Sequence, residues 1–134
     1  MNAQALILPL VAMCLLSSCD GQKNYVKTSS PLHSILENPT RLTHDKVGEA
    51  KARDYILTEL PPGSSETSVS QFIDKHLTRA QRKRAAHEFP EPYICVRTSE
   101  WSSPAGEGWT EIVFLLNRSR RLTDVQVYSV SNTL

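Results

Sequence analysis

The chain has almost no net charge, few glycines and no long apolar run. Lys and Arg number 15 against 14 Asp and Glu, so the net charge of +1 offers no basic surface for a nucleic acid. Five glycines leave little material for phosphate or dinucleotide loops, and no such motif occurs. No apolar run reaches the roughly 18 to 20 residues of a membrane-spanning helix. The 134 residues therefore predict one modest domain, without nucleic-acid binding and without a cofactor.

Motifs of metal binding and catalysis are missing as well. His33, His44, His76 and His87 have no clustered cysteine or acidic ligands, and His87-Glu88 lacks the second histidine of a zinc-protease helix. No Gly-x-Ser-x-Gly nucleophile elbow occurs. We therefore expect no metal, no catalytic residue and no enzyme activity. A polar pocket with convergent ionisable groups would favour the alternative of an enzyme.

The N-terminal segment resembles an export signal. Ala5 to Leu16 reads ALILPLVAMCLL, which is too short to span a membrane and typical of the apolar region of a secretory signal. Ser17, Ser18 and Cys19 follow directly. Met1 to Gln4 contain no Lys or Arg, which departs from the usual signal. The alternative is a core helix that happens to end in a cysteine.

Leu16-Ser17-Ser18-Cys19 resembles the lipobox of bacterial lipoproteins. In that family an apolar residue and two small ones precede a cysteine that receives lipid and becomes the first residue after cleavage. The resemblance implies a signal peptide at residues 1–18, lipidation of Cys19 and a place in the cell envelope, facing the periplasm. Each buried CH₂ of an acyl chain adds about 0.8 kcal/mol, so two or three chains anchor a protein firmly. Asp20 resembles the inner-membrane retention signal of enterobacterial lipoproteins and favours that membrane over the outer one.

Two other cysteines complete the count of three. Cys14 lies in the signal, and Cys95 lies in a strand-like stretch without an intramolecular partner if Cys19 is lipidated. We expect Cys95 to be a small buried apolar side chain. The alternative is a disulfide between Cys19 and Cys95 in an exported protein without lipid.

Residues 19–42 are predicted to be the lipidated cysteine and a flexible tether. Asp20 to Leu42 mixes Gly, Ser, Pro and charges with little periodicity, and only residues 34–37 suggest a turn of helix. A coil of this length spans roughly 26 Å. We therefore expect a folded domain, residues 43–134, that stands some distance from the membrane.

Two helices are predicted at the start of this domain. Thr43 to Leu60 is compatible with one apolar helical face, and Pro61-Pro62-Gly63 ends it. Ser64 or Ser65 is expected to cap a second helix. The short connection predicts a two-helix hairpin. The second helix carries an apolar stripe at helical spacing: Val69, Phe72, Ile73 and Leu77.

Three strands are predicted after the helices, at Tyr93–Ser99, Thr110–Leu116 and Leu122–Val130. The middle run is apolar at successive positions and belongs in the centre of a sheet, whereas the third alternates. Residues 101–109 and 117–121 suit hairpin connections. The fold class is therefore α+β, with the two-helix hairpin packed on a three-stranded antiparallel meander.

A wider resemblance rests on the lipobox, the strings LPPGSS and VSQFIDKHL, and the closing VFLLNRSRRLTDVQVYSV. Over Asp45 to Val130 the chain resembles small proteobacterial lipoproteins with the helix–helix–three-strand plan of the BamE/SmpA-OmlA family and the β-lactamase-inhibitor-protein repeat. The resemblance implies a protein-binding or scaffold module more than an enzyme. The alternative is an immunity-type lipoprotein that inhibits a periplasmic toxin or hydrolase.

Two groups of residues are candidates for contact with a protein partner. Trp101 and Trp109 bracket the first hairpin connection, and tryptophans are favoured interface anchors. Their alternative role is to clamp the two strands together. The other group is basic and would suit an anionic lipid or an acidic partner, or else form a solvated surface: Arg79, Arg82, Lys83 and Arg84.

Overall fold

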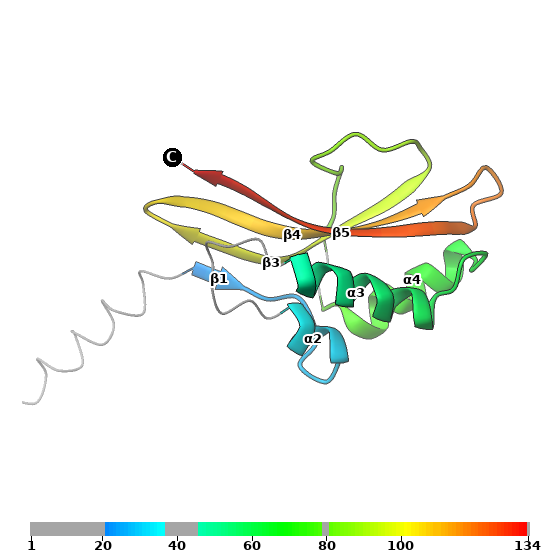
Figure 1. Ribbon diagram of the computed structural model, residues 1–134, viewed down its shortest axis with the longest axis horizontal. Coiled ribbons are helices and arrows are strands. Elements are labelled where there is room, and N and C mark those ends of the chain that lie inside the picture. Colours follow the sequence, from blue (N-terminus) through cyan, green and yellow to red (C-terminus); the bar gives the residue numbers. More distant parts are fainter. Residues whose placement is uncertain (1–20, 37–45, 79–80, 134) are drawn as a thin grey trace, which may run out of the picture.

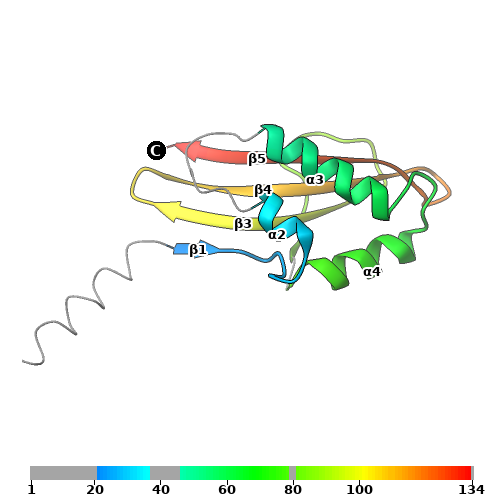
Figure 2. The ribbon, with the colours of Figure 1, turned by 60° about the horizontal axis from the view of Figure 1, so that its bottom comes forward.

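The computed structural model describes residues 21–36, 46–78 and 81–133, and its fold is α+β as predicted. The lipobox, Cys19 and Asp20 lie outside these residues. The helices cover one face of a twisted antiparallel sheet (Figures 1 and 2). The described helices are α2 (Pro31–Leu36), α3 (Lys46–Glu59) and α4 (Glu66–His76). The described strands are β1 (Gly21–Lys23), β2 (Gln81–Arg82), β3 (Tyr93–Ser103), β4 (Gly106–Leu116) and β5 (Leu122–Thr133).

The predicted meander is formed by β3, β4 and β5, with β4 in the centre. The strand order is β1-β3-β4-β5, and β2 also pairs with β3. Ile112, Val113 and Phe114 have no exposed surface, because both faces of β4 are covered. The central position of this apolar run is confirmed. The sheet is wider than predicted, since β1 and β2 pair along the outer edge of β3.

The hairpin between β3 and β4 is longer than the sequence predicted. Residues 101–109 were expected to form the connection, but pairing continues to Ser103 and Gly106. Trp101 pairs with Gly108, and a Cβ on Gly108 would lie 2.5 Å from the indole Nε1. The absence of a side chain at Gly108 makes room for the indole ring of Trp101. The pairing of β3 with β4 therefore continues through a segment whose glycines had predicted a loop.

The second predicted helix is confirmed as α4. Ser65 is its N-cap, and its side chain accepts a hydrogen bond from the backbone N–H of Ser68. Gly63 has φ +94°, a conformation that glycine adopts without strain, and donates its N–H to Leu122 O at 2.7 Å. The connection is thereby fastened to β5. The predicted stripe is buried: Val69, Phe72, Ile73 and Leu77.

The two-helix hairpin differs from its prediction. α3 and α4 follow one another, but they diverge from their connection, and α2 lies near the open end between them (Figure 2). Leu32 of α2 is fully buried. A third helix therefore fills space that two helices alone would leave open over the sheet. The first predicted helix is observed from Lys46, and Thr43 lies outside the described residues.

The prediction of a flexible tether was wrong for residues 21–36. Gly21 pairs with Ser102 in β1 and β3, and Val26 forms a bridge with Leu77. The backbone N–H of Lys27 donates to His76 O at 2.9 Å. This segment changes from strand to turn to helix within a few residues, so it shows no periodicity, yet its isolated apolar side chains are buried: Val26, Leu32 and Leu36.

The outer edge of the sheet, β5, is partly covered by side chains of α3. Arg53 donates from Nε to Val125 O at 3.0 Å and pairs with Asp124 at 2.7 Å. Glu49 accepts the backbone N–H of Ser129 at 2.9 Å. Exposed strand edges invite pairing with other chains. These contacts occupy the carbonyl of Val125 and the N–H of Ser129, which would otherwise be free to pair with another strand.

Candidate functional site

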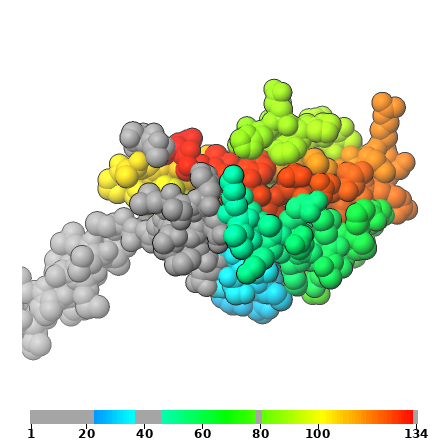
Figure 3. All heavy atoms as spheres, in the orientation of Figure 1, coloured from blue at the N-terminus to red at the C-terminus, as the bar shows by residue number. Residues whose placement is uncertain are grey.

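A segment that we call the strap, residues 83–92, crosses the sheet face opposite the helices (Figures 1 and 3). Beneath it lies Glu111 of β4, which has no exposed surface. Its carboxylate accepts from the backbone N–H of Ala86 at 3.0 Å, from Trp109 Nε1 at 2.9 Å and from the Tyr128 hydroxyl. A buried carboxylate thus joins the strap to both β4 and β5.

The charge of Glu111 is stabilised by these donors. Burial alone would raise its pKa, but the hydrogen bonds from Ala86, Tyr128 and Trp109 and the nearby Arg97 together lower it. Burial, followed by contact with Glu111, raises the pKa of Tyr128. The network is therefore a carboxylate with neutral donors around it at physiological pH.

Cys95 lies beside this carboxylate and is buried. Burial, with the charge of Glu111 as a second cause, raises the pKa of its thiol to about 12. A thiol reacts as its thiolate, so this cysteine is protonated and unreactive at neutral pH. The expectation of a small buried side chain at position 95 is confirmed.

The strap presents basic side chains to solvent. Arg82, Lys83 and Arg84 are exposed, and Arg82 donates to Ser70 Oγ at 3.1 Å. Arg79 lies outside the described residues. A shallow cavity of about 400 Å³ is formed almost wholly by the strap and Tyr93. Two of the four predicted basic residues, Lys83 and Arg84, thus lie on the strap, whereas Arg82 belongs to β2 and contacts α4.

A second polar arrangement links α2, α3 and α4. Ser30 Oγ lies 2.7 Å from His76 Nδ1, and His76 Nε2 lies 2.9 Å from Glu59 Oε2. The hydrogen bond from His76, and next that from Tyr55, lower the pKa of Glu59. The order of groups is that of a hydrolase triad. However, Ser30 is 7% exposed and its Oγ already accepts the N–H of Leu32, which caps α2. The arrangement therefore fastens three segments together.

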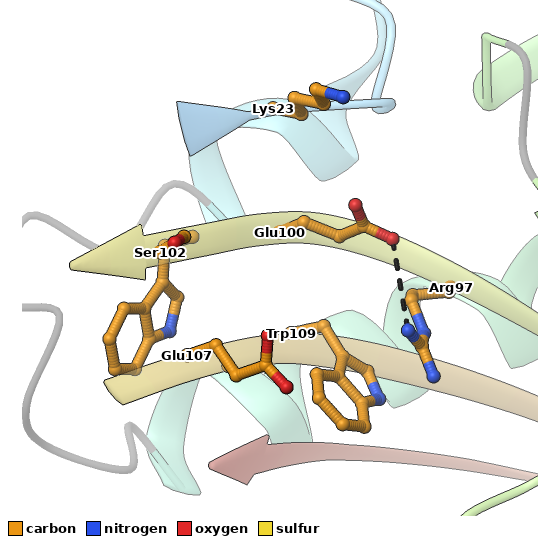
Figure 4. Close-up of a pocket in the computed structure, with 8 residues that line it drawn as sticks. Lys23, Arg97, Glu100, Ser102, Glu107 and Trp109 are labelled. Atoms are coloured by element: carbon orange, nitrogen blue, oxygen red, sulfur yellow. Dashed lines mark ion pairs between the residues drawn. The ribbon is translucent and has the colours of Figure 1, made fainter. Parts of the chain in front are cut away.

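A third arrangement is a cleft at the end of the sheet where β1 begins and β3 ends (Figure 4). Its volume is about 280 Å³. The guanidinium of Arg97 lies 3.9 Å from the centre of the Trp109 ring, and its ion pair with Glu100 is loose at 3.9 Å. The cleft is lined by Lys23, Arg97, Glu100, Trp101, Ser102, Glu107, Gly108 and Trp109.

Both tryptophans are half-buried and occupied in the hairpin. Trp101 packs over Gly108, and Trp109 contacts Arg97 and Glu111. These contacts are what a strand clamp requires, and the same two residues also line the cleft. The structure therefore places the predicted pair at a concave surface rather than on an exposed loop.

The sequence interpretation missed Glu111, Lys23 and Glu107. A signal for Glu111 was available, because a carboxylate directly before the apolar run of a central strand needs donors if that part of the strand is buried. No comparable signal marked the other two. Lys23 enters the cleft only through the pairing of β1 with β3, which joins residues far apart in sequence.

Within residues 21–36, 46–78 and 81–133, no three His, Cys, Asp or Glu side chains gather in a group that would hold a metal ion. No helix in these ranges is sufficiently long and apolar to cross a membrane. Comparison of the chain with protein-family models, curated proteins and solved structures finds no match.

Proposed function

We propose that the chain is a lipid-anchored envelope protein whose domain lies directly at the membrane and binds another protein without enzymatic activity. The observation that carries this proposal is the position of Gly21. It opens β1 only two residues after Cys19 of the lipobox-like sequence. Consecutive Cα atoms are 3.80 Å apart, so the Cα atoms of Cys19 and Gly21 lie within about 7.6 Å of each other. Lipids on that cysteine would hold the end of the sheet at the bilayer.

The strap is the surface that best suits a protein partner. It lies away from β1 on the face opposite the helices (Figure 1), and it exposes Lys83 and Arg84. The strap also exposes Glu88 and Glu91, so the adjacent pair Lys83 and Arg84 is the part of it that would attract an acidic partner and speed the association. The partner we infer is therefore a protein with an acidic surface in the same compartment.

Two further observations support a binding role. The only described Ser–His–Glu arrangement, at Ser30, His76 and Glu59, is used to fasten α2, α3 and α4. The resemblance to small envelope lipoproteins also implies a binding module. The alternative within this proposal is an immunity-type inhibitor, for which the captured partner would be a toxin or hydrolase.

The anchor is tested by mass spectrometry of the mature chain from its membrane fraction. We expect a protein that begins at Cys19 and carries acyl chains, and loss of the added mass in Cys19→Ser. Cys14→Ser and Cys95→Ser are the matched controls, since neither should change the lipid. A mature natural chain without lipid contradicts the anchor.

The partner surface is tested by mild crosslinking and capture from membranes. Reversal of charge in Lys83→Glu/Arg84→Glu should reduce recovery of a reproducible partner about tenfold, because two exposed attractions become repulsions. Lys51→Glu is the control, since Lys51 is an exposed base on α3. Equal recovery with both variants would contradict the assignment to the strap. The captured protein itself distinguishes a scaffold from an inhibitor.

A further inference from the structure

The cleft beside Trp109 lies at the end of the sheet that the anchor would hold. Gly21 pairs with Ser102, which lines the cleft, and paired Cα atoms are about 5 Å apart. Ser102 therefore lies within about 13 Å of Cys19. Bilayers extend about 5–8 Å beyond the hydrocarbon on each side as headgroups. The cleft is thus within reach of the headgroups around the anchor.

The cleft combines both signs of charge with an aromatic ring. Lys23 and Arg97 are its positively charged residues, and Glu100 and Glu107 are its negatively charged ones. Neither Lys23 nor Glu107 forms an ion pair with another described residue. The buried Nε of Arg97 likewise has no hydrogen-bond partner among the described residues. Figure 4 shows Arg97 and Glu107 on opposite sides of the Trp109 ring. A cation that is held only by a loose ion pair with Glu100 and a carboxylate without an ion pair among the described residues thus flank one indole.

We propose that this cleft binds the phosphoethanolamine headgroup of a membrane phospholipid, an inference that rests on the proposed anchor. The phosphate accepts hydrogen bonds from Lys23 and Arg97. The ammonium donates to Glu107 and lies against Trp109, since cations are attracted to the indole face. Tryptophan is also enriched at membrane interfaces, where one part of the ring is apolar and the other meets water. Choline has no N–H donor for Glu107, so ethanolamine is favoured.

The chain provides its own reporter for this site. Its two tryptophans, Trp101 and Trp109, both line the cleft. The lipidated protein is reconstituted into vesicles of 3:1 phosphatidylethanolamine and phosphatidylglycerol, and separately into phosphatidylcholine mixtures of the same surface charge. Acrylamide, a neutral quencher, measures ring accessibility. We expect quenching about threefold weaker in the ethanolamine vesicles, because the headgroup covers Trp109.

Glu107→Gln should remove the difference between the two vesicles, whereas Glu88→Gln, an exposed carboxylate on the strap, should retain it. Equal quenching of the natural protein in both vesicles overturns the headgroup site while leaving the anchor intact.

Failure of the chain to float with vesicles overturns the anchor instead. In that case the purified chain is titrated with dihexanoyl phosphatidylethanolamine below its micellar concentration. Saturable protection that is about fivefold weaker in Glu107→Gln supports the cleft, and absence of protection overturns it.

Discussion

Glu111→Ala is expected to lower the free energy of unfolding by about 3–5 kcal/mol, because it leaves buried donors and the nearby Arg97 without their carboxylate. Urea denaturation measures this loss. Glu107→Ala is the matched control, since Glu107 is an exposed carboxylate on the same face of β4. It should cost less than about 1 kcal/mol. Similar losses in both variants would show that the strap does not depend on the buried charge.

The same carboxylate should make the stability of the protein depend on acid. The pKa of Glu111 is lowered in the fold, so its contribution is present above the ordinary pKa of about 4.3 and is lost as pH falls through the lower folded value. Glu111→Gln removes this titration. The free energy of unfolding should therefore fall less steeply below pH 4.3 in this variant than in the natural chain. Part of the slope should persist, because the pKa of Glu59 is also lowered. Parallel curves would contradict a charged Glu111.

Strongly periodic or uniformly apolar segments were predictable from the sequence. The stripe of α4 repeats over three turns, and the run at β4 is short, rich in β-branched and aromatic residues and preceded by glycines, which favours a buried strand. The cap was narrowed to Ser64 or Ser65 from the sequence, and the structure selects Ser65, because a capping side chain acts within its own turn. These elements are determined by residues that are neighbours in the sequence.

Elements that depend on distant partners were not predictable. β1 is three residues long and α2 six, too short for a period to show. Their places are fixed by β3 and by His76, which lie far along the chain. The burial of Glu111 was missed because it depends on the strap, whose backbone N–H at Ala86 is 25 residues away in the sequence. The cleft was missed for the same reason, since β1, β3 and β4 each contribute part of it.

Leu32→Ala is expected to release residues 21–36 from the domain. Leu32 is fully buried, and Leu→Ala at such sites costs about 2–5 kcal/mol. The amide of Lys27, bonded to His76 O, should exchange at least about 30-fold faster with deuterium, whereas amides near Phe114 should change less. Ile35→Ala on the same helix is the control, since Ile35 is only half-buried. Equal acceleration throughout would indicate global unfolding and contradict separate docking of the segment.

Release of this segment should also change how the domain meets the membrane. Freed as a coil, its 16 residues would span about 22 Å, at 5–6 Å times the square root of the number of residues. That length exceeds the headgroup layer several-fold, so the cleft would leave the bilayer surface while Cys19 stayed anchored. Leu32→Ala protein should therefore still float with ethanolamine vesicles, yet its tryptophans should regain the acrylamide quenching seen in choline vesicles. If the tryptophans stay shielded although Lys27 exchanges rapidly, the docked segment does not set the distance between the sheet and the membrane.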